Sequence, residues 1–320
     1  MGGAIDEKVP QRLRRLVSGV PLLNAIYHQL RRIAPQRSQS FWDLPVEVAV
    51  RMAYNVALLR EPDEGGERDF VRRLESGEIT RNDMVQWLRE STEFSQRISA
   101  LGVSIHLGRC DFVRSLPRAQ RILDLGGTDL NNQNGAMVQM GYPYPFEELV
   151  VIDLPSQDRH AIYRSPDNTR KVATPLGPVT YRYASMTDLS EFADETFDLV
   201  YSGQSIEHVE RSEGRVVLHE AYRVLRPGGH LGLDTPNARA TRLQQTEFID
   251  PDHKVEYTHD ELSGMLLEAG YTVLESKGLN YVGKSLEAGT FEVEEAAANR
   301  GLHAEVRDCY ILTYLCQKST

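Results

Sequence analysis

The stretch RILDLGGTDLNNQNG, residues 121–135, decides the fold that this sequence predicts. It has the character of a buried strand that runs into an aspartate and two glycines. Glycines at the end of a strand let the backbone approach a ligand, and the helix that follows directs its N–H groups to the same place. The GxGxxG pattern of a dinucleotide site is absent. From this segment alone, a cofactor site and a purely structural turn are both open interpretations.

Beyond residue 116 the hydrophobic pattern alternates between strands and helices. Helical spacing occurs, for example, at 214–225 and 260–269. This alternation predicts an α/β domain over residues 116–320, with a mostly parallel sheet that helices cover on both faces. Ligands are then expected outside the carboxyl ends of the strands. The predicted strands are 121–125, 149–153, 179–184, 197–202, 230–234, 271–277 and 309–315.

The first 40 residues carry an excess of positive charge. Seven lysines and arginines stand there against Asp6 and Glu7, whereas the whole chain has a net charge of −10. Leu22, Ile26 and Leu30 share one face of a predicted helix in this segment. We expect residues 1–40 to form a basic helical arm that either packs on the protein or lies on an anionic membrane surface.

Helical patterns continue over residues 41–115, which we expect to form a small all-α domain. The predicted helices are 42–59, 69–74 and 84–88, with a turn at 60–66 and a cap made by Thr80 and Asp83. The segments REPDEGG (60–66), LESGEIT (74–80) and STEF (91–94) resemble a helical domain of unknown function that bacterial proteins carry beside glycosyltransferases or methyltransferases. This resemblance implies a glycan-related neighbourhood and assigns no functional residue.

Composition limits the function classes. A net charge of −10 argues against a general nucleic-acid binder, because affinity for phosphates depends on cationic surface. Cys110, Cys309 and Cys316 lack the spacing of a metal site and are expected to be reduced packing residues. No apolar run is long enough to span a bilayer, and the N-terminus lacks the apolar segment of a signal peptide. We therefore expect a cytoplasmic protein, with the arm as a contact to the inner face of the membrane if it binds lipid.

Five segments, in this order, resemble the class I S-adenosylmethionine-dependent methyltransferases. The resemblance implies a Rossmann-like doubly wound sheet of seven strands, the last antiparallel, preceded here by the small all-α domain. It also implies S-adenosyl-L-methionine as cofactor and S-adenosyl-L-homocysteine as product. The segments are LDLGG (123–127), VVIDLP (150–155), ADETFDLVYSGQSIEHV (193–209), EAYRVLRPGGHLGLDTPN (220–237) and EYTHDELSGMLLEAGY (256–271).

An acid at the tip of the second strand is placed to accept hydrogen bonds from a ribose diol, which is the role expected for Asp153. The resemblance implies the other cofactor contacts. Asp124, Gly126 and Gly127 lie at the amino-acid end of the cofactor and Met186 packs on its base, while Ser202 and Gly203 form the floor of the cofactor cleft. Where many relatives hold the adenine amine with an acid, this chain has Met186, and Asp188 is a second candidate contact.

Methyl transfer to a hydroxyl also needs a base, and histidine is suited because its ordinary pKa lies near neutrality. His208 follows the fourth strand and Asp234 ends the fifth, so the two are expected to act as a base and its orienting carboxylate. The alternative is that His208 only begins a helix. His253 is a second candidate base or a substrate contact. Asp250, Asp252, His253 and Glu256 are read as a solvated polar loop, so no metal is expected.

The sequence thus predicts an O-methyltransferase that acts on a sugar hydroxyl of a glycan, a glycolipid or a glycosylated metabolite. One alternative is methylation of a lipid, a quinone or a carboxylic acid. Another is a binding module that keeps the fold without catalysis. A nicotinamide oxidoreductase is disfavoured by the missing GxGxxG. The acceptor is expected to be a small molecule or a glycan and not a nucleic acid, and the sequence does not predict the oligomeric state.

Overall fold

A computed structural model describes residues 45–58, 62–128, 133–159, 167, 171–244, 248–250 and 252–319. The basic arm over residues 1–40, with its two interpretations, lies outside these residues. The chain divides into two compact units, Met1–Ser99 with Gln245–Pro251, and Ala100–Gln244 with Asp252–Thr320. Each is described by itself.

The described part of the first unit is helical, as the sequence predicts. Helices α3 (Val46–Leu58), α4 (Glu64–Glu75) and α5 (Arg81–Glu90) enclose a small core that includes Ala49, Tyr54 and Met84. The predicted cap of α5 is confirmed, because Thr80 and Asp83 form a reciprocal capping box. The prediction of a turn through residue 66 is wrong. Asp63 accepts a hydrogen bond from the backbone N–H of Gly66, so α4 already begins at Glu64.

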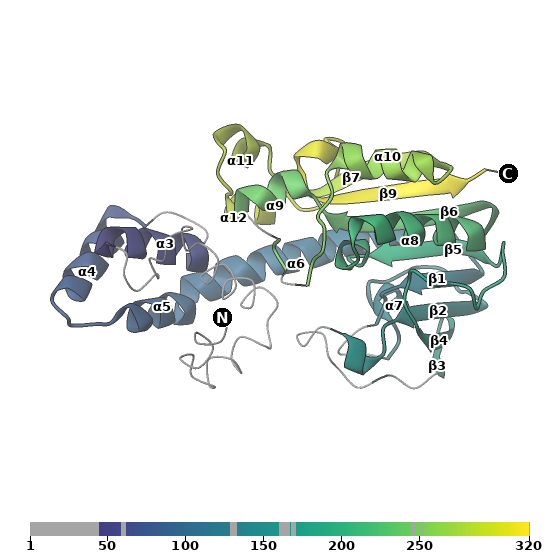
Figure 1. The fold of residues 1–320 in the computed structure, drawn as a ribbon, viewed down its shortest axis with the longest axis horizontal. Coiled ribbons are helices and arrows are strands. Elements are labelled where there is room, and N and C mark those ends of the chain that lie inside the picture. The colour runs from purple at the N-terminus through teal and green to yellow at the C-terminus, as the bar shows by residue number, and fades with distance from the viewer. Residues whose placement is uncertain are drawn as a thin grey trace, which may run out of the picture. The chain divides into compact units, whose positions relative to one another are not determined.

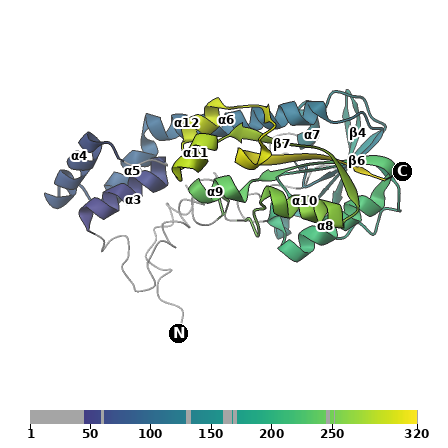
Figure 2. The ribbon, with the colours of Figure 1, turned by 90° about the horizontal axis from the view of Figure 1, so that it is seen from above.

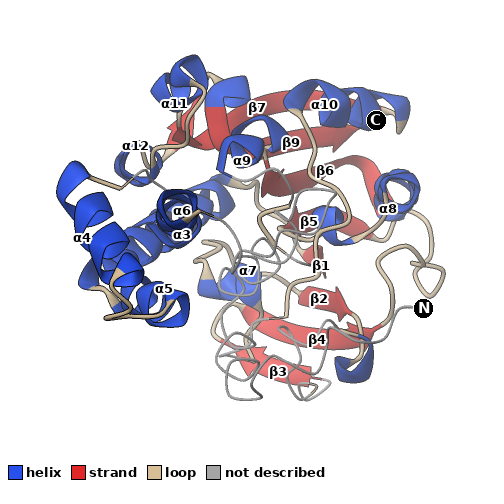
Figure 3. Cartoon of the chain, turned by 60° about the vertical axis from the view of Figure 1, so that its left-hand side comes forward, coloured by secondary structure: helices blue, strands red, loops and turns tan. Residues whose placement is uncertain are grey.

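The second unit is built on one sheet with the strand order β3-β4-β2-β1-β5-β6-β9-β7-β8 (Figure 3). The pairs between β4, β2, β1, β5 and β6 are parallel, and β9 is antiparallel to both β6 and β7. The bounds are β1 Arg121–Leu125, β2 Glu148–Asp153, β3 Lys171–Thr174, β4 Gly177–Tyr183, β5 Phe197–Gly203, β6 Leu225–Pro236, β7 Tyr271–Tyr281, β8 Leu302–His303 and β9 Cys309–Lys318.

Helices cover both faces of this sheet (Figures 1 and 2). On one face, α8 (Arg211–Val224) and α10 (His259–Glu268) bury Val217, Leu262 and neighbouring side chains against the strands. On the other face, α7 (Ala136–Gln139) and the C-terminal half of α6 (Thr92–Ser115) bury Met137, Phe112 and Val113. Because β1, β2 and β5 are buried on both faces, their sequences are almost continuously apolar.

The remaining elements are short. Helices α9 (Ala238–Gln244), α11 (Gly283–Ala288) and α12 (Val293–Ala298) lie between the later strands in the sequence. Single 3₁₀ turns occur at η3 (Ser156–Asp158), η4 (Ile206–His208) and η5 (Val306–Asp308). The η4 turn directly follows β5 and holds the SIEHV motif, so it carries part of the candidate site.

The predicted α/β fold is confirmed. All seven predicted strands form, with β9 antiparallel, and two short antiparallel strands, β3 and β8, are added at the edges. The pairing of β5 with β6 is interrupted near its start, since Phe197 pairs with Leu225 but Leu199 already pairs with His230. Cys110, Cys309 and Cys316 are all buried and unpaired. Within the described residues, no helix is long and apolar enough to cross a membrane.

Candidate active site at the carboxyl edge of the sheet

Parallel strands bring their carboxyl ends to one edge of the sheet. Leu125 at the end of β1 is in register with Ile152 near the end of β2 and with Ser202 near the end of β5. Gly203 is in register with Asp234 of β6. Predicted site residues from four strands are therefore gathered at the edge where α/β sheets bind ligands.

Asp124 and the two glycines after it form the end of β1. Gly126 has a φ of +75°, and a Cβ there would lie 2.7 Å from the Cβ of Ser205. A Cβ on Gly127 would lie 2.1 Å from Oδ2 of Asp124. A side chain at either position would displace these neighbours, which explains the glycine pair.

The Asp124 carboxyl group is buried, and its Oδ2 has no hydrogen-bond partner among the described residues. Burial raises the pKa of Asp124 to about 7, although the backbone N–H of Met137 and the charge of Arg109 act in the opposite direction. The carboxylate would be stabilised by a cationic or hydrogen-bond-donating ligand at this point.

Asp153 ends β2, as the sequence predicts. Its Oδ1 accepts a hydrogen bond of 2.7 Å from the backbone N–H of Leu154 and lies 3.5 Å from Nε of Arg159. Arg159 is almost fully buried and donates to the carbonyl of Leu154 at 2.7 Å. These contacts hold the Asp153 carboxylate, which remains partly exposed, at the strand tip.

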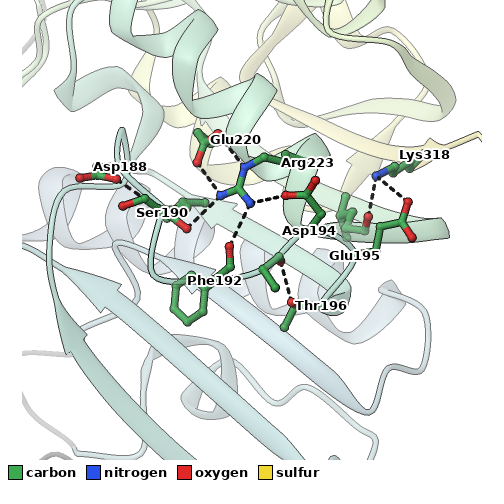
Figure 4. Close-up of polar contacts among 12 residues, drawn as sticks. Asp188, Ser190, Phe192, Asp194, Glu195, Thr196, Glu220, Arg223 and Lys318 are labelled. Carbon is green, nitrogen blue, oxygen red and sulfur yellow. Dashed lines mark hydrogen bonds and ion pairs between the residues drawn. The ribbon is translucent and has the colours of Figure 1, made fainter.

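Met186 and Asp188 lie in the loop between β4 and β5. Met186 packs partly buried against the core beneath α8. Hydrogen bonds from the side chain and from the backbone N–H of Ser190 lower the pKa of Asp188. Arg223 of α8 binds this loop through its backbone, since it donates to the carbonyls of Leu189 and Phe192, both at 2.9 Å. Arg223 also forms ion pairs with Asp194 and Glu220 (Figure 4).

Ser202 and Gly203 end β5. The Ser202 side chain is buried, and its Oγ lies 2.6 Å from Oγ of Ser205 in the following turn. Among the described residues, Ser205 is the hydrogen-bond partner of the Ser202 hydroxyl. The carboxyl end of β5 is thereby held close to the Gly126 turn, because Ser205 is also the residue that a Cβ on Gly126 would meet.

Asp234 is fully buried at the centre of a polar network. Its Oδ1 accepts from Nε of Arg109 at 2.7 Å and from Nε2 of Gln204 at 3.0 Å, and its Oδ2 accepts from the Tyr201 hydroxyl at 2.5 Å. Burial and the charge of Asp234 raise the pKa of Tyr201, so its hydroxyl stays protonated. The expected pairing of Asp234 with His208 is not present, since no hydrogen bond joins these two described side chains.

Two histidines in this region each contact a carboxylate of the 252–258 loop. Nδ1 of His208 lies 3.1 Å from Oδ2 of Asp252. Nδ1 of His253 lies 2.8 Å from Oε1 of Glu256, whose other oxygen accepts from Thr241. The ring centroids of the histidines are 5.0 Å apart. The structure thus brings together the two candidate bases, which the sequence treated separately.

Glu207 was not predicted as a site residue. It is fully buried; its Oε2 accepts from the Thr235 hydroxyl at 2.9 Å, and Oε1 has no partner among the described residues. Burial raises the pKa of Glu207, whereas charge on His253 or His208 would lower it. The signal available in the sequence was its position in SIEHV, where an acid next to a histidine also suits an ordinary helix start.

Two family models match parts of this chain. A profile described as a methyltransferase domain matches residues 136–233, and a domain of unknown function, DUF4214, matches residues 37–98. No curated protein matches the chain. The first match spans Asp153, Ser202 and His208 but begins after Gly126. Residues 136–233 therefore match a methyltransferase domain, in keeping with S-adenosyl-L-methionine as the cofactor that the sequence predicts.

Several solved structures are similar to this chain. A SAM-dependent methyltransferase from Thermotoga maritima shares 17% identity over 73% of this chain and 98% of its own, with a TM-score of 0.45. A SAM-dependent methyltransferase from Archaeoglobus fulgidus shares 14% over 70% and 98%, with a TM-score of 0.45. An S-adenosylmethionine-dependent methyltransferase from Mesorhizobium loti shares 18% over 64% and 95%, with a TM-score of 0.41.

The residues present fit this cofactor. The buried, unpartnered Oδ2 of Asp124 is an acceptor that the ammonium group of a bound amino acid would satisfy. A side chain on Gly127 would displace this carboxyl group, and the Asp153 carboxylate at the next strand tip suits ribose hydroxyls. The strand ends therefore offer the polar groups that such a molecule needs.

Proposed function

We propose that this chain transfers the methyl group of S-adenosylmethionine to a hydroxyl group of a sugar in a glycan, a glycolipid or a glycosylated metabolite. The observation that carries the hydroxyl part is the histidine pair His208 and His253, each supported by a carboxylate. Activation of a poorly acidic hydroxyl is the step for which such a pair is suited.

On the cofactor side, Asp124, Gly126, Gly127 and Asp153 would hold the amino-acid end and the ribose, with Met186, Ser202 and Gly203 as the further contacts that the resemblance implies. When bound, the cofactor supplies a methyl group on a sulfonium, which transfers by in-line displacement. The residues at the strand ends align donor and acceptor for that displacement.

On the acceptor side, the oxygen forms its bond to the methyl carbon and loses its proton. We assign the activation of this hydroxyl to His208 and His253. Asp252 and Glu256 are the positioning residues, because each contacts Nδ1 of one ring and so fixes the orientation of that ring. Asp252 thus takes the place that the sequence analysis expected for Asp234.

The sugar part of the proposal is supported by the helical region before the methyltransferase domain. Residues 37–98 match DUF4214, and this region resembles domains carried beside glycosyltransferases and methyltransferases. We also propose that residues 1–40, 41–115 and 116–320 act as arm, helical domain and catalytic domain, in the cytoplasm, with the arm as the point of any membrane contact.

The test uses the full chain with methyl-labelled S-adenosylmethionine and a panel of short sugars and lipid-linked glycans. We expect label in a sugar product that survives mild base, as a methyl ether does and a methyl ester does not. Label only in a lipid, a quinone or a carboxylic acid would replace the sugar by that acceptor. Failure to bind S-adenosylhomocysteine would indicate a non-catalytic module.

A further inference from the structure

Glu207, His208 and His253 place three potential metal ligands around one point. One ligand atom from each lies within 4.8 Å of the other two. The loop that carries His253 is fastened to the η4 turn, because the backbone N–H groups of Lys254 and Val255 donate to the carbonyl of Glu207 at 2.8 and 3.2 Å. The grouping is therefore held by the backbone.

Both histidines show the partner arrangement that is typical of metal-binding imidazoles. A histidine ligand usually donates its second ring N–H to a carboxylate or a carbonyl, which fixes the tautomer and turns the other nitrogen toward the ion. Here Nδ1 of His208 contacts the carboxylate of Asp252, and Nδ1 of His253 contacts the carboxylate of Glu256. In both rings Nε2 is the nitrogen that this arrangement would present.

The third ligand supplies a second, independent indication. Glu207 is fully buried, and its Oε1 finds no hydrogen-bond partner among the described residues. A buried carboxylate oxygen without a donor is costly, and a cation at this point would satisfy it. The Thr235 hydroxyl holds the other oxygen at 2.9 Å, so the carboxylate is oriented.

We propose that Glu207, His208 and His253 bind a divalent first-row transition-metal ion such as Zn²⁺ or Co²⁺. Two imidazole nitrogens and one carboxylate favour such ions over Ca²⁺ and Mg²⁺, which prefer oxygen ligands. Metal–ligand bonds of about 2.0–2.2 Å require neighbouring ligand atoms about 3.0–3.5 Å apart. The side chains, now within 4.8 Å, would close by roughly an ångström on binding. His253 belongs to the polar loop that the sequence analysis read as solvated and without a metal, but in the structure His253 and Glu256 of that loop are buried.

Three protein ligands leave coordination positions open. An acceptor hydroxyl on the ion would have a lowered pKa and would lose its proton to solvent more easily as the carbon–oxygen bond forms. This catalytic role rests on the proposed function, whereas ion binding does not. The two are therefore tested by different measurements.

The binding experiment uses the full chain, free of affinity tags and treated with a chelator, without cofactor or acceptor. Zn²⁺ is titrated by calorimetry, and Co²⁺ is followed by its visible absorption. We expect one ion per chain with a dissociation constant in the micromolar range or tighter. Glu207→Gln and His253→Ala are expected to weaken binding by at least about 100-fold, and Asp252→Asn by about 10- to 100-fold.

His219→Ala is the matched control, because His219 is exposed on α8 outside the cluster, and it should bind like the parent. Circular dichroism checks that each variant is folded; Glu207→Gln keeps the side-chain shape and can be read if an alanine variant is not folded. No binding up to about 1 mM Zn²⁺, or unchanged one-to-one binding in Glu207→Gln and Asp252→Asn, would overturn the proposal. Sugar methylation without ion binding would retain the proposed function and reject the ion.

Discussion

The two ends of the candidate site are assembled in different ways. The proposed cofactor end has Asp124, Gly126 and Gly127, which are nearly consecutive, with Asp153 on the adjacent parallel strand. The proposed acceptor end joins η4 with Thr235 of β6 and with the 252–258 loop. A site made from one strand end can be recognised in the sequence, whereas a site made from three distant segments depends on the fold.

The largest expected effect separates the two ends directly. His208→Ala should lower turnover by about 10²–10⁴-fold, because the group that activates the hydroxyl is removed. Affinity for S-adenosylhomocysteine should stay unchanged, since His208 is assigned to the acceptor end only. Steady-state kinetics and calorimetry measure the two quantities, with His219→Ala as the control. A turnover loss below about fivefold would move the role elsewhere.

The contacts of Asp234 allow a test of whether this residue stabilises the fold or takes part in the reaction. Arg109→Met leaves the buried Asp234 carboxylate without its cation and should lower the free energy of unfolding by about 3–5 kcal/mol. Urea denaturation measures this change. Arg114→Met is a matched substitution on the surface of the same helix, because the ion pair of Arg114 with Asp111 spans 3.8 Å and is exposed. It should change the free energy of unfolding by less than about 1 kcal/mol. Equal stability of both variants would contradict the stabilising role of the Arg109–Asp234 ion pair.

Asp153→Ala probes the cofactor end alone. It should weaken S-adenosylhomocysteine binding by about 1.5–3 kcal/mol, the range for hydrogen bonds to a charged group. Zn²⁺ binding, measured in the same preparation, should not change, because the contacts described for the Asp153 carboxylate are with Leu154 and Arg159 and not with the proposed ligands Glu207, His208 and His253. Unchanged cofactor affinity would contradict the ribose assignment.

The pH dependence of cofactor binding gives the smallest expected effect. The pKa of Asp124 is about 7 in the folded chain against an ordinary value of 3.8, so the unliganded folded state holds an extra proton between these values. Its stability should therefore fall as the pH rises from about 4 to 7. Binding of an ammonium group favours the carboxylate and releases the proton.

Affinity for S-adenosylhomocysteine should accordingly rise by about tenfold per pH unit below 7 and level off above it. Calorimetry between about pH 5.5 and 8 measures the slope, and Asp124→Asn should bind more weakly with no slope in this range. A slope that persists in Asp124→Asn would assign the proton to another group.

Local patterns predicted most of the fold for a simple reason. Strands buried on both faces are apolar throughout, so β1, β2 and β5 were evident. The edge strands β3 and β8 were missed because they are short and only partly buried. The start of α4 was misplaced because two glycines indicated a turn, while the Asp63 cap allowed a helix.

The sequence by itself determined the α/β fold, the strand-end position of Asp124 and Asp153, and the choice of His208 and His253 as candidates. Only the tertiary structure paired His208 with Asp252 instead of Asp234, enclosed Asp234 with Arg109 and Tyr201, and left one oxygen of Glu207 without a donor among the described residues. The physical reason is that strand patterns report burial along one segment, whereas partners of polar side chains are set by segments that meet only after folding.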